Sequence, residues 1–261
     1  MPDIGIITGS GFDEMEGIVG KELKKVSTPY GETSDAYRIC EISGIEVAFL
    51  ARHGRSHHIQ PHRINYRANL WGFKQLGVER LFSVGAVGGI NPSLIPGDII
   101  IPDQIIDMTC GRVSTFFEGD EVVHIDFTSP FCTDLRNVLV QAGKQSSQYL
   151  KGEATYICVN GPRLETKAEI RSFSLLEADV VGMTVMPEAS LARELELCIA
   201  NISVVTNYAA GISERPLTVT EVIEVMKHAN VPISLLLSNS LQIMPHERTC
   251  ECRRALRNAR I

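Results

Sequence analysis

The feature of the sequence that most constrains the fold is a repeated pattern, in which a short apolar run ends in a cluster of small or polar residues. Clear cases are Ile4–Thr8 before Gly9-Ser10-Gly11, Glu46–Ala51 before Arg52-His53, and Arg80–Ala86 before Gly88-Gly89. Amphipathic stretches separate these runs. Because buried strands that alternate with helices are typical of α/β proteins, the sequence predicts an α/β fold with a largely buried sheet. Ligands gather beyond the carboxyl ends of such strands, so the clusters are candidate site residues.

The other expected elements follow from hydrophobic periodicity and from Gly and Pro positions. Further strands are expected at Asp98–Ile101, Thr155–Val159, Asp179–Met183 and Cys198–Val205. Helices are expected at Asn65–Leu76, Glu165–Phe173, Pro187–Glu196, Thr218–His228 and Ile233–Leu241. No linker or internal repeat divides the chain, so residues 1–261 are expected to form one domain, with about 242–261 set apart as a C-terminal tail.

Composition and charge exclude several classes of protein. The chain has 261 residues, with 25 Lys and Arg against 31 Asp and Glu, and a formal net charge of -6. A negative surface repels a polyanion, so a nucleic-acid partner is not expected. No segment is apolar over the roughly 18 residues that a membrane-spanning helix needs, and the N-terminus has no basic leader, so no membrane partner is expected. The odd, scattered set of seven cysteines predicts a reduced, cytoplasmic protein.

The strongest local signal is Arg52-His53-Gly54-Arg55-Ser56-His57-His58, which concentrates two guanidinium groups and three imidazoles in an acidic chain. A guanidinium offers a planar fork of donors that matches phosphate oxygens. The i,i+4 spacing of His53 and His57 also fits a metal site, but the interleaved arginines would repel a cation and no acidic ligand lies nearby in the sequence. We therefore favour a phosphate site over a metal site or a solvated basic loop, and we expect no metal.

Several other clusters each allow a structural and a functional interpretation. Gly9-Ser10-Gly11 is either a tight turn or an anion-binding loop. Glu165 is either a first-turn carboxylate of the next helix or a pocket residue, and Thr184 either binds phosphate or caps a helix. Asn207 either forms a turn or reads the edge of a heterocycle. An apolar stripe at helical spacing, more often core than pocket, comprises Val219, Val222, Ile223 and Met226.

The C-terminal segment Cys250-Glu251-Cys252 invites a metal interpretation that the sequence does not complete. Two thiols one residue apart do not make a tetrahedral site, and the sequence offers no second pair. We interpret them as ordinary cysteines in a basic tail, whose arginines form a solvated helix face.

Taken in order, the motifs resemble those of the trimeric purine nucleoside phosphorylases, in particular the branch of 5′-methylthioadenosine and 5′-methylthioinosine phosphorylases. The resemblance runs from about Ile4 to about Leu237. It rests on Ile6–Gly11, Ala51–Arg55, Asn65–Trp71, Gly85–Gly89, Gly161–Thr166 and Val181–Glu188. It implies a single-domain α/β fold with a mixed, barrel-like central sheet flanked by helices. It also implies a homotrimer that uses no metal or organic cofactor.

The resemblance implies roles for individual residues. Inorganic phosphate, the co-substrate, would be held by Ser10, Arg52, His53, Thr184 and the backbone at Gly85 and Ala86. Glu165 and Asn207 would be the catalytic pair that binds the purine. The other substrate-binding residues would be Leu164, Met183 against the ribose, Ala209, Val219, Val222, and His124 reaching the site of a neighbouring subunit. The family reaction is phosphorolysis, in which phosphate attacks the anomeric carbon as the bond to the purine breaks, without a protein nucleophile.

Departures within the family predict the substrate. Asn207 and Glu165 stand where the methylthioadenosine branch has Asp and a small hydroxyl residue, and they match enzymes for 6-oxopurines. An ionised Glu165 accepts from the N1–H of a 6-oxopurine and Asn207 donates to O6 or N7, whereas adenine presents a lone pair at N1. Val219 stands where general purine nucleoside phosphorylases place a His for the 5′-hydroxyl, and an apolar side chain there suits a 5′-methylthio group.

We therefore expect phosphorolysis of S-methyl-5′-thioinosine to hypoxanthine and 5-methylthioribose 1-phosphate. Two enzymatic alternatives are release of adenine from 5′-methylthioadenosine and a broad 6-oxopurine nucleoside phosphorylase. A hydrolase and a nucleoside-binding module without catalysis are the alternatives from other classes.

Overall fold

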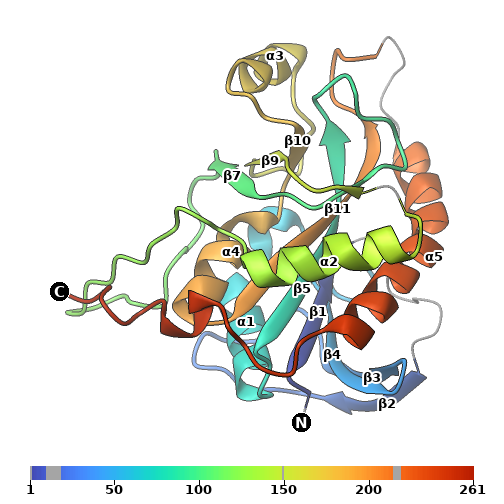
Figure 1. Ribbon diagram of the computed structural model, residues 1–261. Coiled ribbons are helices and arrows are strands. Elements are labelled where there is room, and N and C mark those ends of the chain that lie inside the picture. Colours follow the sequence, from blue (N-terminus) through green and yellow to red (C-terminus); the bar gives the residue numbers. More distant parts are fainter. Residues whose placement is uncertain (1, 10–18, 149, 214–218) are drawn as a thin grey trace.

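The computed structural model describes residues 2–9, 19–148, 150–213 and 219–261, and a mixed β-sheet runs through its centre (Figure 1). The hydrogen-bonded order is β2-β3-β4-β1-β5-β10-β9-β7, while β11 pairs with β5 and β6, and β6 with β8. The strands of the described residues are β1 Ile4–Thr8, β2 Val19–Lys24, β3 Tyr37–Ile42, β4 Ile45–Ala51, β5 Arg80–Gly89, β6 Ile99–Ile100, β7 Gln104–Asp107, β8 Leu150–Lys151, β9 Thr155–Cys158, β10 Val180–Gly182 and β11 Cys198–Tyr208.

Helices cover both faces of the sheet. They are α1 Tyr66–Gln75, α2 Thr133–Gln145, α3 Lys167–Leu175, α4 Val185–Glu194 and α5 Val219–Ile243, with short 3-10 turns η1 Pro61–Arg63 and η2 Glu251–Arg254. Helices α2 and α5 lie on one face, and α1 and α4 lie on the other (Figure 1). Successive side chains of β1 alternate between the two cores, with Ile6 on the α2–α5 side and Ile7 on the α1–α4 side. The predicted α/β fold with a mixed central sheet flanked by helices is confirmed.

Two predicted strand ends are corrected. Strand β5 continues through Gly88-Gly89, and β11 continues to Tyr208 instead of stopping at Val205. The two strands pair with each other as far as Tyr208 opposite Gly89, and this pairing outweighs the turn preference of the glycines. Strands β2, β3, β7 and β8 and helix α2 were not anticipated from the sequence.

Helix α5 is continuous, whereas the sequence predicted two helices separated near Pro232. A proline inside a helix costs about 3 kcal/mol because it removes a hydrogen bond and crowds the preceding turn. Here residues on both sides of Pro232, including Met226, Ile233 and Leu237, are buried in the same core cluster. Burial of these side chains therefore holds the helix together across the proline. No helix in the described part of the chain is long and apolar enough to span a membrane.

Strand β5 determines where a ligand can enter, because it has three partner strands. Strand β11 pairs with it along its whole length, β1 pairs with Arg80–Val84, and β10 pairs with Gly88 and Gly89. A strand has only two edges, so β1 and β10 share the edge away from β11. Between them, among the described residues, positions 85–87 have no strand partner on that edge. Gly9 donates its N–H to Val84 O on this edge, so the backbone groups of Ala86 face the same gap.

Candidate active site

A cavity of about 430 Å³ lies over this gap in the edge of β5. Its lining brings together side chains from the ends of β4, β5, β10 and β11 and from the loop before α3. Ten of the residues to which the resemblance gives a role line it, namely Arg52, His53, Gly85, Ala86, Leu164, Glu165, Met183, Thr184, Asn207 and Val222. Chain positions more than 150 residues apart thus form one site.

Four candidate residues are not placed in this cavity. Ser10 and the side chain of Val219 lie outside the described residues. His124 is exposed and lines a separate cavity beside the C-terminal arginines. Ala209 does not line the cavity: its N–H donates to Gly89 O and its side chain is buried with Ile170 and Phe173, so the substrate contact expected of it stays a prediction.

Arg52 is buried, and most of its donors are already used inside the protein. The guanidinium donates to both carboxylate oxygens of Glu188, to Ser83 Oγ at 2.8 Å and to Val84 O at 3.1 Å. Among the described residues, one N–H of Nη1 has no acceptor. Nη1 lies close to Gly9, where a methyl group would be 3.2 Å from it. The expected two-pronged fork toward phosphate is therefore corrected to a single donor. The sequence analysis gave Glu188 no role. Its only sequence signal is that it is the last residue of the Val181–Glu188 motif.

His53 presents an acceptor to the cavity. Its Nδ1 lies 2.8 Å from the carbonyl oxygen of Ile59, so this nitrogen carries the hydrogen and Nε2 remains unprotonated. Burial and the neighbouring Arg52 charge lower the pKa of His53 to about 4. The imidazole is therefore neutral at pH 7, and it can accept a hydrogen bond from a hydroxyl-bearing ligand.

Thr184, Gly9 and Gly85 lie in the same part of the cavity as Arg52. Thr184 is the N-cap residue of α4, but its side chain makes no capping hydrogen bond, so the capping interpretation is excluded and the hydroxyl is available to the cavity. A methyl group on Gly85 would lie 4.0 Å from Thr184 Oγ1, and one on Gly9 would lie 3.9 Å from Gly85 Cα. The hydroxyl of Thr184, Nη1 of Arg52 and the open backbone edge of β5 thus converge.

The remaining basic residues of the 52–58 segment divide between the cavity and the surface. Arg55 lies outside the cavity and pairs with Asp35, at 3.0 Å between Nε and Oδ2. His57 and His58 line the rim, and the His57 ring lies 4.5 Å from the His53 ring, centroid to centroid.

Glu165 also lines the cavity, and it lies just before α3 begins. Thr166 is the N-cap of α3, and Thr166 and Glu169 form a reciprocal capping box. The first-turn carboxylate is therefore Glu169, and the interpretation of Glu165 as a helix-start residue is wrong. Glu165 is half-buried at the cavity wall, and burial raises the pKa of its carboxyl.

Asn207 is aimed into the cavity by an irregularity in β11. The register between β11 and β5 shifts between Val205 and Asn207, and such bulges redirect a side chain. As its amide is assigned, Asn207 Oδ1 accepts from Thr206 Oγ1 at 2.9 Å and Nδ2 donates to Tyr208 O at 2.9 Å. Counting described partners only, one N–H of Nδ2 remains to donate to a ligand.

Arg112 is a positioning residue that sequence reasoning missed. It donates to the carbonyl oxygens of Met183 at 2.7 Å and Asn160 at 2.9 Å, and its Nη1 also reaches Met186 O. It therefore ties the segment before α3 to the segment before α4. Gly161 has a φ of 60° and is approached so closely by Met183 that a methyl group there would lie 2.3 Å from the sulfur.

Comparison with known proteins identifies the family. Residues 3–242 match the model of the phosphorylase superfamily. A probable S-methyl-5′-thioinosine phosphorylase of Thermodesulfovibrio yellowstonii is 53% identical over 98% of this chain and 96% of its own. A 6-oxopurine nucleoside phosphorylase of Pyrococcus furiosus is 46% identical over 99% of both chains.

A solved structure agrees with the sequence comparisons. The crystal structure of a methylthioadenosine phosphorylase from an antarctic soil metagenomic library superposes with a TM-score of 0.93 at 36% identity, covering 100% of this chain and 92% of that one. The chain belongs to the phosphorylase superfamily, and the resemblance to purine nucleoside phosphorylases that its motifs carry is confirmed.

Proposed function

We propose that the protein catalyses phosphorolysis of S-methyl-5′-thioinosine, which gives hypoxanthine and 5-methylthioribose 1-phosphate. The observation that carries the proposal is one cavity with an anion-binding corner at Arg52, His53 and Thr184 and a purine-matched pair at Glu165 and Asn207. The name of the 53% identical relative supports the same substrate.

Phosphate is proposed to fill the gap in the edge of β5. The donors offered to it are one N–H of Arg52, the Thr184 hydroxyl, the backbone at Gly85 and Ala86, and Ser10 from outside the described residues. Hydrogen phosphate also carries a hydroxyl, which it donates to Nε2 of neutral His53. These contacts orient one phosphate oxygen toward the sugar, and positioning of this kind is a large part of catalysis.

The reaction needs no group from the protein as nucleophile. A phosphate oxygen forms a bond to C1′ while the C1′–N9 bond breaks, and the electron pair of that bond goes to the purine. Asn207 donates its free amide N–H to N7 or O6, where negative charge develops, and Glu165 accepts from N1–H. The purine takes up its proton from water, and no cofactor is needed.

The proposed preference for a 5′-methylthio group on the sugar rests on apolar side chains in the cavity wall. Val222 and Met183 contribute apolar surface to the cavity, and Val219 directly follows residues 214–218, which lie outside the described part of the chain. A 5′-methylthio group fits such surroundings, whereas a 5′-hydroxyl would be left without a partner.

A second candidate function, phosphorolysis of 5′-methylthioadenosine, is favoured by one observation. Burial raises the pKa of Glu165, and a protonated carboxyl donates a hydrogen bond to N1 of adenine instead of accepting one. The superposed methylthioadenosine phosphorylase structure is consistent with this alternative.

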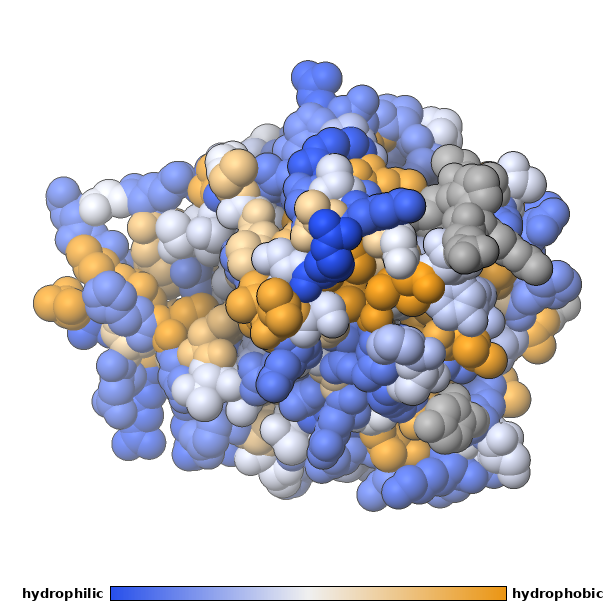
Figure 2. Space-filling model, turned by 90° about the horizontal axis from the view of Figure 1, so that it is seen from above, coloured by the Kyte–Doolittle hydropathy of each residue, from blue (hydrophilic) through white to orange (hydrophobic). Residues whose placement is uncertain are grey.

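An assembly of three copies and a cytoplasmic location belong to the same proposal. The end of the molecule that carries the C-terminus presents apolar surface among charged residues (Figure 2). Val113, Val122 and Ile261 are exposed, and Ile261 donates its N–H to Val122 O, so the C-terminus and the segment around His124 form one surface. Exposed apolar surface of this kind fits contact with a neighbouring subunit, which His124 would enter.

The test is a panel of S-methyl-5′-thioinosine, 5′-methylthioadenosine and inosine, each with and without phosphate, with release of the base followed by chromatography. We expect phosphate-dependent release of hypoxanthine from the methylthio nucleoside to be fastest. Faster release of adenine supports the second candidate, and equal turnover of inosine indicates a broad 6-oxopurine enzyme. Release without phosphate identifies a hydrolase, and binding without release identifies a binding module.

A further inference from the structure

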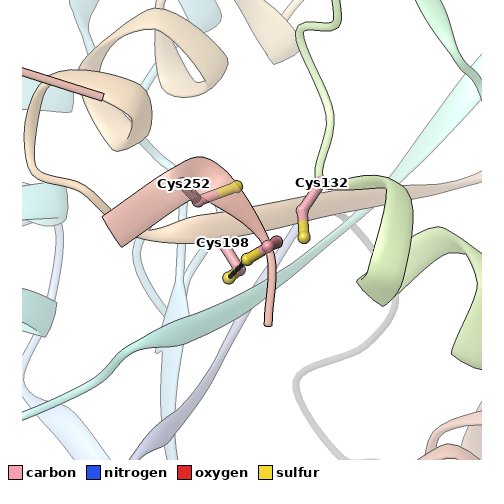
Figure 3. Close-up of side chains that lie close together, drawn as sticks. Cys132, Cys198 and Cys252 are labelled. Carbon is pink, nitrogen blue, oxygen red and sulfur yellow. Dashed lines mark hydrogen bonds between the residues drawn. The ribbon is translucent and has the colours of Figure 1, made fainter. Parts of the chain in front are cut away.

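Four of the seven cysteines lie together at the opposite end of β11 from the candidate active site. Cys132 is the N-cap residue of α2, Cys198 is the first residue of β11, and Cys250 and Cys252 belong to η2 and its N-cap. Their sulfur atoms all lie within 4.8 Å of one another. Figure 3 shows the sulfurs of Cys132, Cys198 and Cys252 directed toward a common space. The second pair of thiols that the sequence analysis did not find therefore comes from two distant elements.

The spacing of the sulfurs fits a tetrahedral metal ion. With Zn–S bonds of about 2.3 Å, two ligands of a tetrahedral zinc are about 3.8 Å apart. The sulfurs of Cys198 and Cys250 are 3.3 Å apart, and the other pairs lie within the 4.8 Å limit. Changes of about 1 Å or less in these distances, within the reach of small side-chain rotations, place all four sulfurs at bonding distance from one centre.

The positions of the thiols are fixed by contacts that do not involve sulfur. Cys132 donates its N–H to Ile199 O at 2.8 Å, which holds the start of α2 against β11. Arg80 donates to Pro245 O and His246 O, both at 3.0 Å, which holds the segment leading to η2. Cys132, Cys198 and Cys252 are buried and Cys250 is half-buried, so the set resembles a closed structural site with four protein ligands. The arginines of the C-terminal segment are exposed, as the sequence predicted, whereas Cys252 is buried.

Two guanidinium groups face the cluster. Arg193 Nη1 donates to Cys252 Sγ at 3.8 Å. Arg248 interacts with Cys198 and Cys250, and its Nε is buried without a hydrogen-bond partner among the described residues. Four thiolates around a divalent ion carry a net charge of −2, and buried charge requires a nearby opposite charge. Two arginines beside the sulfurs supply it, as outer-shell partners do in metal sites.

We propose that Cys132, Cys198, Cys250 and Cys252 bind one Zn²⁺ ion, which fastens the C-terminal segment to β11 and α2. Soft thiolate ligands in a tetrahedral arrangement favour zinc over hard cations such as magnesium or calcium. A cavity of about 220 Å³, lined in part by Cys132, Cys198 and Cys250, gives the ion a path from solvent. The nine residue steps from Cys198 to Asn207 along β11 span about 30 Å, so the ion stabilises the fold without touching the nucleoside.

The full-length protein, prepared under reducing conditions in a zinc-containing buffer, tests the proposal. We expect one zinc per chain by elemental mass spectrometry, and the absorption of a tetrahedral thiolate complex when Co²⁺ replaces zinc. Removal of the metal by a chelator in the presence of reductant should lower the thermal midpoint by about 5 °C or more. These measurements need no substitution, so they hold even where a cysteine variant does not fold.

Variants locate the site. Cys250→Ser should lose the bound zinc, whereas Cys110→Ser, which replaces an exposed thiol outside the cluster, should keep it. Base release by Cys110→Ser and by the zinc-free wild-type protein at 25 °C should match that of the zinc-loaded protein, which separates this proposal from the proposed function. The proposal is overturned if the folded, reduced protein takes up no zinc, if Cys250→Ser retains it, or if peptide mapping of unreduced protein finds the four cysteines joined as disulfides.

Discussion

Arg52 and Glu188 form a buried ion pair beneath the cavity, in which the guanidinium donates to both carboxylate oxygens and the two residues are 1% and 0% exposed. Ser83 Oγ donates to the same carboxylate at 2.9 Å. The pair neutralises the charge that the sequence assigned to phosphate. Within the described part of the chain, Arg52 therefore has one N–H left for a ligand.

Replacement of Glu188 by Gln should damage both stability and phosphate binding. The substitution keeps the shape of the side chain but leaves a buried guanidinium without its counter-charge, at a cost of about 3–5 kcal/mol in the free energy of unfolding. Reorientation of Arg52 should also raise the KM for phosphate. Denaturant titration and phosphate kinetics measure the two effects.

Asp35→Asn is the matched control, because Asp35 pairs with the exposed Arg55 outside the cavity. An exposed pair contributes about 1 kcal/mol or less, and the KM for phosphate should not change. Equal losses in the two variants would contradict the role given to Glu188.

The free energy of unfolding should differ between the wild type and His53→Asn by an amount that depends on pH. The pKa of His53 is lowered to about 4 by burial and by Arg52, from an ordinary value of about 6.5 in the unfolded chain. Between these values the unfolded state binds more protons, so the contribution of neutral His53 is complete above about pH 6.5 and is lost as the pH falls toward 4. The loss amounts to about 3 kcal/mol at most. Unfolding curves for both proteins over this range test the prediction, and parallel curves would refute it.

Glu165→Gln should reduce turnover of 6-oxopurine nucleosides specifically. Loss of a charged acceptor from N1–H costs about 1.5–3 kcal/mol, which corresponds to about a 10- to 150-fold lower kcat/KM. Because burial raises the pKa of Glu165, wild-type kcat/KM should also increase with pH as this carboxyl ionises, and the variant should lack that limb.

Glu169→Gln provides the comparison for Glu165→Gln. Glu169 lies four residues further on, where it pairs with Arg163 at 2.7 Å and closes the capping box of α3. Its replacement should lower stability modestly and leave the preference between hypoxanthine and adenine unchanged. A change of base preference in this variant would argue against Glu165 as the residue that reads N1.

Arg112→Met should weaken nucleoside binding through the loops that Arg112 joins. Removal of the guanidinium leaves the carbonyl oxygens of Met183, Met186 and Asn160 without this donor, at about 1–3 kcal/mol for each that stays buried. The KM for the nucleoside should rise more than kcat falls. Arg136→Met removes a comparable arginine that donates to Pro102 O and Gly152 O away from the cavity, so it should lower stability without changing KM.

The sequence predicted where the site lies better than it predicted which residues bond to one another within it. The clusters after Ala51, Val84 and Thr206 were visible because the apolar run before each one ends abruptly in small or polar residues. The partner of Arg52 was not visible, since Glu188 is 136 positions away and only the packing of α4 beneath the sheet brings them together. The same limit applies to Arg112, which acts through backbone carbonyls that carry no sequence signal.

The errors in the prediction also have a physical pattern. The sequence predicted a break in a helix at Pro232 and the end of a strand before Gly88-Gly89. The helix continues because its side chains are buried on both sides of the proline, and the strand continues because it pairs with β11. For the cysteines the sequence missed a contact instead of predicting a false break. Cys132 and Cys198 are remote in sequence from Cys250 and Cys252 and become their neighbours only in the fold. Local preference was overruled wherever distant segments supplied enough contact.

The shared edge of β5 has a consequence for how this site can change. Where β1 stops and β10 has not yet begun, the protein leaves a place for one hydrogen-bonding unit that its own chain does not fill. An oxyanion bound there accepts hydrogen bonds that a neighbouring strand would otherwise accept. The ability to bind it therefore depends on how the strands pair and less on particular side chains. Exchange of the surrounding side chains can then retune which nucleoside is accepted while the anion seat survives.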